Sequence, residues 1–264
     1  MSDLKTARAA AERGARLTRE DALLLYEDND LLALAQWARA AKERASGKSV
    51  YYTVNRHINL TNICRANCPL CAFQVEQGDA RGYIMETDDV ARVLELAKKT
   101  PRLTEIHIVS ALHPDRSFSY YEGVVRQVRA ALPHADIKAF TPVEVVNFAK
   151  TEGTSVRDIL RRLQLVGLSS LPGGGAEILS DRVRAIICPN KATRAEWLDC
   201  MRTAHELGIR TNASMMYGHI ETVEERIDHL LALRELQDAT GGFQAFMLFP
   251  FHPENTALGA ERKL

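Results

Sequence analysis

Three of the five cysteines in this 264-residue chain lie close together. Cys64, Cys68 and Cys71 follow a C-x3-C-x2-C spacing. Thiolates this near in sequence either bind a metal or oxidise. A closed structural zinc site takes four ligands. Three cysteines can instead hold a [4Fe–4S] cluster and leave its fourth iron open to a small molecule. The spacing therefore favours an iron–sulfur cluster, and a zinc site completed by a distant histidine is the alternative.

Composition and charge favour a globular enzyme. The hydrophobic fraction of 46% allows a large core, and the balance of 34 basic against 34 acidic residues argues against a nucleic-acid partner. No apolar run is long enough to span a membrane. The charged N-terminus lacks the apolar stretch of a secretory signal. Clustered cysteines in a chain without a signal predict a reducing, cytoplasmic location.

The first 48 residues are helical by pattern. Thr18 is a candidate N-cap, because acidic residues follow it in the first turn. A helical stripe of apolar residues comes next: Leu31, Leu34, Ala35, Ala38 and Ala41. We predict an N-terminal helical cap over residues 1–48, packed on a main domain over residues 49–264.

From residue 49 on, strand and helix patterns alternate. We expect strands at 50–54 with 58–60, 105–109, 136–140, 167–171, 209–215 and 243–248. We expect helices at 90–98, 120–132, 156–166, 194–207 and 224–237. This alternation predicts a parallel sheet with right-handed crossovers. Six strands fall short of the eight in a closed barrel. The expected fold is an α/β partial (β/α)6 TIM-like barrel, with the N-terminal helices covering its open edge.

Polar residues collect just after the expected strands, where the active sites of βα barrels lie. They include His113, Glu144, Gly173-Gly174-Gly175, Glu177 and His252. Each has a plainer interpretation. The two histidines precede prolines and can be turn residues, the glycines can form a simple turn, and the two acids can be solvated. Their convergence on one rim is the stronger argument for a shared site.

Two other features suggest structural roles. Cys200 lies beside Trp197 in an expected helix, so we predict a buried apolar cysteine. Asp228, His229 and Arg234 belong to a mixed-charge helix face, which is typical of a solvated surface.

The cysteine loop after the first strand of a partial barrel resembles the radical S-adenosylmethionine (SAM) superfamily. The resemblance implies a [4Fe–4S] cluster held by Cys64, Cys68 and Cys71. The open iron would bind SAM, and one electron would then release a 5′-deoxyadenosyl radical inside the barrel. It also implies a one-electron reductant, such as a flavodoxin or ferredoxin, as partner.

Three further stretches narrow the resemblance. Residues 56–64 resemble the branch that contains the futalosine-pathway enzymes of menaquinone biosynthesis and the deazaflavin-cofactor synthases. Residues 170–178 narrow it to the futalosine-pathway enzymes, and the third stretch is residues 251–256. The last is similar to the aminofutalosine synthase family. That family adds the adenosyl radical to 3-[(1-carboxyvinyl)oxy]benzoate and releases carbon dioxide, so SAM is a consumed substrate. The alternatives are a dehypoxanthine futalosine cyclase-type enzyme and a truncated, non-catalytic iron–sulfur protein.

The resemblance also implies roles for individual residues. Ser110 and Ala111 stand where the superfamily usually has a glycine pair that contacts the methionine amino group. Glu177 is a candidate ribose or methionine contact, and Leu70 stands where an aromatic residue usually helps to seat adenine. Charge complementarity to a substrate with two carboxylates suggests Arg56, Arg184, His113 and His252. The family usually continues beyond the last residue here, so a C-terminal extension is expected to be missing.

Overall fold

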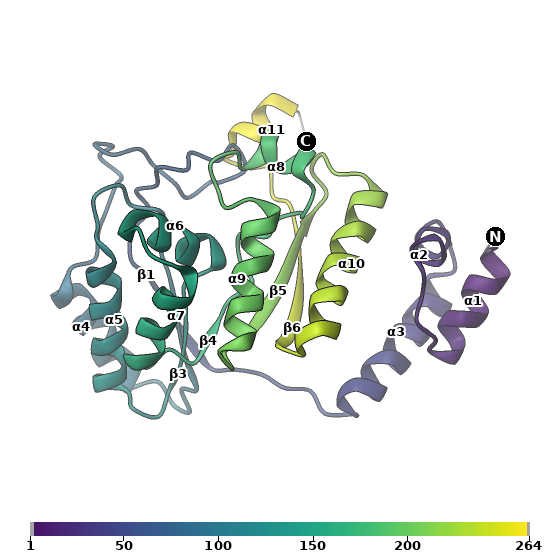
Figure 1. Cartoon of the computed structure of the whole chain (residues 1–264), viewed down its shortest axis with the longest axis horizontal. Coiled ribbons are helices and arrows are strands. Elements are labelled where there is room, and N and C mark those ends of the chain that lie inside the picture. The colour runs from purple at the N-terminus through teal and green to yellow at the C-terminus, as the bar shows by residue number, and fades with distance from the viewer. Residues whose placement is uncertain (1–2, 263–264) are drawn as a thin grey trace.

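The sheet of this protein has six parallel strands in sequential order. The computed structural model describes residues 3–262 (Figure 1). The strands are β1 (Asn55–Asn59), β2 (Glu105–Val109), β3 (Asp136–Ala139), β4 (Ser170–Leu171), β5 (Arg210–Tyr217) and β6 (Phe243–Pro250). They pair as β1-β2-β3-β4-β5-β6, and every pairing is parallel. The predicted partial (β/α)6 barrel is confirmed.

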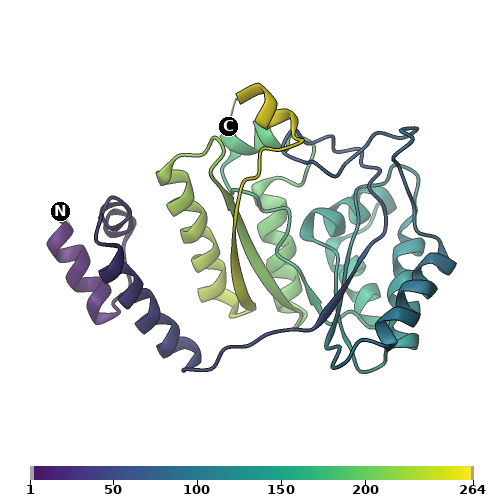
Figure 2. The same ribbon diagram turned by 180° about the vertical axis from the view of Figure 1, so that it is seen from behind.

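Helices cover one face of this sheet and leave the other free. The helices after β1 are α4 (Thr87–Lys98), α5 (Phe118–Ala131), α6 (Pro142–Glu152), α7 (Val156–Leu165), α8 (Asp181–Ile187), α9 (Arg194–Glu206), α10 (Val223–Thr240) and α11 (Ala257–Arg262). Of these, α8 and α11 lie beyond the ends of the strands and not on the face (Figure 1). Helices α6, α7 and α9 lie in front of the strands in Figure 1, and the bare face of the sheet is seen from behind in Figure 2. All crossovers therefore run on the same side.

Strand alternation explains the asymmetry between the two faces. Ile58, Ile106, Ile108 and Ile137 are at most 1% exposed and belong to the core beneath the helices. Successive side chains of a strand point to opposite faces. Their sequence neighbours therefore point to the face without helices, which we call the inner face.

The N-terminal helices lie beside α10. They are α1 (Leu4–Arg13), α2 (Arg19–Tyr26) and α3 (Leu31–Ser46), and Thr18 caps α2 as predicted. Arg19 of α2 pairs with Asp228 of α10 at 2.6 Å, and Arg234 donates to the carbonyl oxygen of Leu17. No described side chain of α3 is buried. The expectation that its apolar stripe packs on the main domain is therefore wrong, because α2 makes the contact with α10 instead.

The segment between α3 and β1 also differs from the prediction. Val50, Tyr51 and Tyr52 are 77–86% exposed and form no strand. Strand β1 begins at Asn55, where pairing with Glu105 of β2 begins. The aromatic and β-branched residues favour a strand locally, but the neighbouring strand that would pair with them is absent at this level of the sheet.

The sequence pattern did not predict three of the helices: α6, α8 and α11. Helix α6 had a readable signal. Thr141 is its N-cap, Pro142 occupies its first turn, and Glu144 completes a capping box. The segment assigned to a loop after β3 is thus the start of a helix, which holds Glu144 at the end of the strand.

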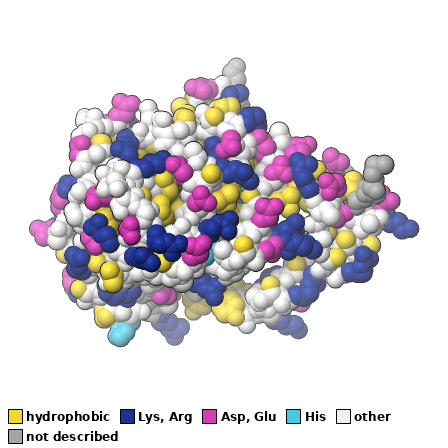
Figure 3. All heavy atoms as spheres, viewed as in Figure 1, with side chains coloured by type: hydrophobic (Ala, Val, Ile, Leu, Met, Phe, Trp, Pro, Cys, Tyr) yellow, Lys and Arg dark blue, Asp and Glu magenta, His cyan; other side chains and the backbone are white. Residues whose placement is uncertain are grey.

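The surface seen in Figure 3 carries basic and acidic side chains interspersed, without a large patch of one sign over the helices. This distribution matches the equal totals of basic and acidic residues. Within residues 3–262, no helix is both long and apolar enough to cross a membrane.

Candidate functional site

The cysteine loop lies at the carboxyl edge of the sheet, which we define as the edge where the six strands end. Neighbouring segments hold it by backbone hydrogen bonds. Arg65 donates to Leu112 after β2 at 2.9 Å, and Leu258 of α11 donates to Pro69 at 2.9 Å. The side chain of Asn190 donates to the Ala66 carbonyl at 3.1 Å. Segments far apart in sequence therefore fix the shape of this loop.

The three thiols of the loop have different environments. Cys68 is buried, whereas Cys64 and Cys71 are half-buried. Burial raises the pKa of the Cys68 thiol to about 12, and the nearby positive charge of Lys191 partly opposes this. A bound metal reverses such a shift, because a coordinating thiol is deprotonated.

A buried carboxylate joins the loops after β2 and β3. Glu144 is 2% exposed and accepts hydrogen bonds from the backbone N–H groups of Ser110 and Thr141, each at 2.7 Å. The side chain of Tyr121 lies near Ser110 and Cys64. Ala111 donates to the Thr61 carbonyl at 3.2 Å. The candidate residues Ser110 and Ala111 are thus held against the cysteine loop, and Tyr121 is a neighbour that sequence reasoning missed.

An ion pair follows β4. Glu177 Oε1 lies 2.6 Å from Lys191 Nζ, and both side chains are largely buried. Burial raises the pKa of Glu177, but the charges of Lys191, Arg184 and His219 outweigh it, so the pKa is below its ordinary value. Glu177 has a φ of 46°, a left-handed backbone that is uncommon outside glycine. Lys191 interacts electrostatically with Cys68, which places this pair beside the cysteine loop. No local sequence signal marks Lys191.

The glycine run after β4 is explained by close packing inside the protein. A Cβ atom on Gly173 would lie 2.7 Å from the backbone of Ala213 in β5. Arg184 is buried, and its guanidinium donates to the carbonyl oxygens of Ala176 and Ala192. Arg184, suggested above as a carboxylate ligand, therefore organises this loop instead.

The structure separates the other candidates for substrate contacts. His113 is 6% exposed, and its Nδ1 accepts the backbone N–H of Asp115 at 3.1 Å. His252 is exposed on the segment after β6. Arg56 is the register partner of buried Ile106, so it faces the helices, where its guanidinium lies 3.4 Å from the Thr100 hydroxyl. The structure does not bring Arg56 to the carboxyl edge.

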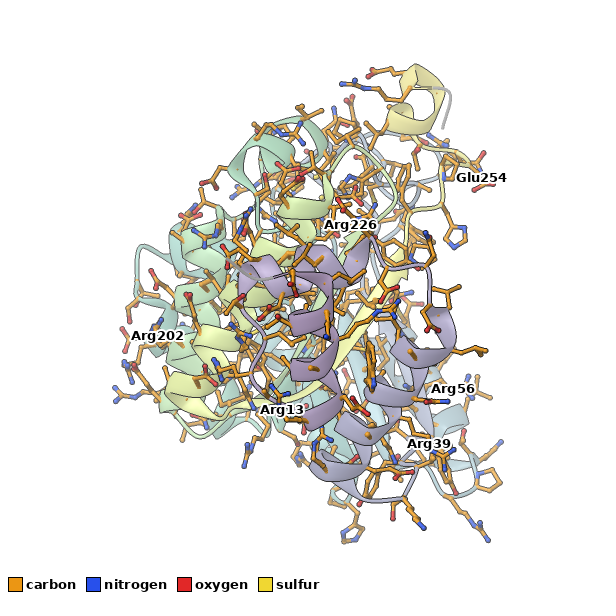
Figure 4. All side chains as sticks on the ribbon, turned by 90° about the vertical axis from the view of Figure 1, so that its right-hand side faces the viewer. Arg13, Arg39, Arg56, Arg202, Arg226 and Glu254 are labelled. Carbon is orange, nitrogen blue, oxygen red and sulfur yellow. The ribbon has the colours of Figure 1, made fainter. Side chains whose placement is uncertain are left out.

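Figure 4 shows the same separation. Glu254, on the segment between β6 and α11, lies at the upper end of the molecule, and Arg56 lies well below it.

The sequence prediction for helix α10, which follows the loop after β5, is wrong at one residue. His229 of α10 was expected on a solvated face, yet it is fully buried, and its Nδ1 accepts the Leu179 N–H at 3.0 Å. His219 and Glu221 follow β5, and the Glu221 carboxylate accepts the backbone N–H of His219 at 2.9 Å, with neither side chain exposed. These histidines have mainly structural partners.

Comparison with known proteins explains this arrangement. Residues 58–233 match the family model of the radical SAM superfamily. The chain belongs to the radical SAM superfamily. Among solved structures, this radical SAM chain is similar to the FeFe-hydrogenase maturase HydG of Carboxydothermus hydrogenoformans, with a TM-score of 0.72 and 18% identity over 97% of this chain and 58% of that one. At this identity the likeness concerns the fold.

Curated relatives of this radical SAM protein carry two different names. It is 42% identical over 248 residues to an aminodeoxyfutalosine synthase of Thermus thermophilus, covering 94% of this chain and 66% of the relative. It is 41% identical over 249 residues to a 5-amino-6-(D-ribitylamino)uracil–L-tyrosine 4-hydroxyphenyl transferase of Methanosarcina mazei, covering 94% and 64%. The chain thus spans slightly less than two thirds of each relative.

Radical SAM enzymes use a [4Fe–4S] cluster and SAM, and the donor set of the cysteine loop fits such a cluster. Three thiols on one short loop are the soft ligands that iron–sulfur clusters take. Within residues 3–262, no three or more His, Cys, Asp or Glu side chains are grouped to hold a single metal ion.

Proposed function

We propose that this chain catalyses the aminodeoxyfutalosine synthase reaction. It would add the 5′-deoxyadenosyl group of SAM to 3-[(1-carboxyvinyl)oxy]benzoate, with loss of carbon dioxide, in menaquinone biosynthesis. The observation that carries this proposal is the 42% identity to a synthase over 94% of the chain. The alternation of strands and loops that brings six segments to one carboxyl edge supports it.

The cluster would be held by Cys64, Cys68 and Cys71. When bound, it supplies the electron that cleaves the sulfonium of SAM. A small reductant such as a flavodoxin or ferredoxin would deliver that electron. The side chain of Leu70, packed against the core beside Cys71, would offer an apolar surface to adenine.

The neighbouring loops offer complementary groups for the rest of SAM. Ser110 and Ala111 would lie beside the methionine amino group, since Glu144 and Thr61 hold their backbone in place. Lys191 would attract the methionine carboxylate, and Glu177 would accept hydrogen bonds from ribose hydroxyls. Their mutual pairing keeps both groups charged before the ligand arrives.

His113 has a donor suited to a substrate oxygen. Because its Nδ1 accepts a backbone N–H, the neutral ring carries its proton on Nε2. Burial lowers the pKa of His113, so the ring is neutral at pH 7. Nε2 is buried and has no partner among the described residues, and an unpaired buried donor gains from a ligand that accepts its hydrogen bond. His252 would add a second contact from the segment after β6.

Product analysis tests the proposal. The reconstituted protein is incubated without oxygen with dithionite, SAM and the enolpyruvyl benzoate, and the products are identified by mass spectrometry. Aminodeoxyfutalosine is the expected product. Parallel reactions with 5-amino-6-(D-ribitylamino)uracil and tyrosine test the activity for which the second relative is named. An adduct formed only there would overturn the proposal, and 5′-deoxyadenosine without an adduct would favour a cyclase-type reaction.

A further inference from the structure

The inner face carries a row of polar side chains from four adjacent strands. We call His57, His107, Lys138 and Ser170, which are register partners on β1 to β4, the inner row. Ile106 and Ile108 flank His107 in β2 and are buried against the helices. His107 and its register partners therefore point the other way, to the face that no helix covers (Figure 2).

Lys138 is a charged donor in this row. Its ammonium lies 2.6 Å from Glu105 Oε2, and 11% of the side chain is exposed. An ammonium has three N–H donors, and Glu105 is its one hydrogen-bond acceptor in the described part of the chain. Glu105 therefore stabilises the charge, while further N–H groups are available to a ligand. Glu105 and its register partner Asp136 lie two residues nearer the amino ends of their strands, so an anion can approach from the carboxyl side.

The two histidines form a flat surface beside Lys138. The ring centroids of His57 and His107 are 4.4 Å apart, with an interplanar angle of 23°. Burial lowers the pKa of His107 to about 4, and the charges of His57 and Lys138 add to this effect. The His107 ring is therefore neutral at pH 7. His57 lies on the edge strand and is exposed, so an aromatic ligand can extend the stack.

We propose that the inner row binds an aromatic carboxylic acid, with its carboxylate on Lys138 and its ring against His57. This inference rests on the proposed function, because the enolpyruvyl benzoate is such an acid. Thr61, at the cysteine loop, lies four positions after His57, about 13 Å along an extended strand. The benzoate ring held at the inner row would point its enol ether toward the carboxyl edge, where the adenosyl group would lie.

Binding measurements on the reconstituted protein test this site. We would titrate 3-hydroxybenzoate and the enolpyruvyl benzoate by calorimetry without oxygen. The double variant Glu105→Gln/Lys138→Met removes both charges and leaves no buried ion unpaired. This variant should lower the affinity for both acids at least tenfold, which corresponds to the loss of one charge-assisted hydrogen bond. The matched control Glu95→Gln/Lys98→Met changes an exposed pair on α4 that also lies at 2.6 Å, and its affinity should equal that of the wild type.

A second pair of variants tests the stack with little risk to folding, because His57 is exposed. His57→Phe keeps an aromatic ring and should bind 3-hydroxybenzoate more tightly than His57→Ala. Iron content and circular dichroism should match the wild type in every variant.

The outcomes separate the two proposals. Unchanged affinity in the double variant would overturn the inner-row site, even if the wild type forms aminodeoxyfutalosine. Binding of 3-hydroxybenzoate that depends on Lys138, without formation of the adduct, would uphold the site and reject the proposed function. A wild type that binds neither acid would overturn the site.

Discussion

At the scale of single residues, Glu144 connects more of the site than any cysteine does. Its carboxylate accepts N–H groups from the ends of two strands and the hydroxyl of Thr141. Ser110, which Glu144 binds, lies near Tyr121, and Tyr121 also lies near Cys64. A glutamine has one acceptor oxygen in place of two, so it cannot accept the backbone N–H groups of both Ser110 and Thr141.

We therefore expect Glu144→Gln to weaken both the fold and cofactor binding. One buried N–H loses its acceptor, which costs about 1–3 kcal/mol of unfolding free energy. Urea unfolding measures this loss, and equilibrium dialysis with SAM measures the affinity. Thr151→Val, at a solvent-exposed hydroxyl on the same helix that bonds its own backbone, is the control. Equal stability of Glu144→Gln and wild type would contradict the role assigned to Glu144.

The titration of Glu144 predicts a dependence of stability on pH. Burial raises its pKa from 4.5 to about 7, although hydrogen bonds from Thr141 and Ser110 oppose the shift. The folded protein thus holds this proton more tightly than the unfolded chain, and wild-type stability should fall as the pH rises from about 4.5 to about 7. The stability difference between wild type and Glu144→Gln should narrow across that range. A constant difference in urea unfolding from pH 5 to pH 8 would contradict this.

The cysteines give a prediction about iron. Replacing Cys64, Cys68 or Cys71 by alanine should lower the iron content well below about four per chain and abolish formation of 5′-deoxyadenosine. Cys200→Ala is the matched control. This thiol is fully buried in α9, so its loss should cost about 1 kcal/mol of stability and leave the iron content unchanged. Iron analysis and absorbance after anaerobic reconstitution measure both effects.

At the scale of elements, the N-terminal helices are joined to the barrel by few strong contacts. Arg16 and Arg19 pair with acids of α10 at exposed positions, where ion pairs contribute little free energy. The segment from residue 47 to residue 54, which has no regular structure, links α3 to β1. The predicted division at residue 48 falls within this segment and stays a proposal.

Limited proteolysis tests the exposure of this segment. Tyr51 and Tyr52 are 81% and 77% exposed, so chymotrypsin should cut there first and release a fragment containing α1 to α3. Mass spectrometry identifies the cut. Tyr51→Ser/Tyr52→Ser should delay it severalfold, whereas a first cut inside the sheet would show that the segment is protected.

At the scale of the whole molecule, the sheet is open at both edges. β6 pairs with β5 alone, and its side chains Phe246, Leu248 and Phe249 are exposed. Unpaired edges with apolar side chains promote association between chains. No described strand closes the sheet into a barrel. In the inner row His57 is exposed, whereas Lys138 and Ser170 are buried.

Self-association should therefore depend on β6. Leu248→Lys places a charge on an apolar side chain that is 54% exposed and should reduce concentration-dependent association. Light scattering after size exclusion, over a range of concentrations, measures the effect. The exposed α7 residue Leu165→Lys is the control. An equal change in both variants would show that general surface charge, and not the edge of β6, governs association.

Much of the fold was readable from local pattern. The alternation of strands and helices predicted six parallel strands, and the residues around Thr18 predicted a helix start, because capping and side-chain period are local properties. The burial of Cys200 followed from its helical neighbours. The capping box at Thr141 was equally local but was not recognised. The cysteine spacing predicted a cluster site, because three ligands on one short loop need no distant partner.

Only the tertiary structure decided which side chains meet. Lys191 and Tyr121 reach the cysteine loop from segments far away in sequence. Arg56 and His57 are adjacent residues, yet one faces the helices and the other faces the inner row. Which side a strand residue faces depends on register with its neighbours, and a shift of one residue reverses it. Register is set by long-range pairing and core packing, so the sequence by itself placed the cysteine loop but not the groups around it.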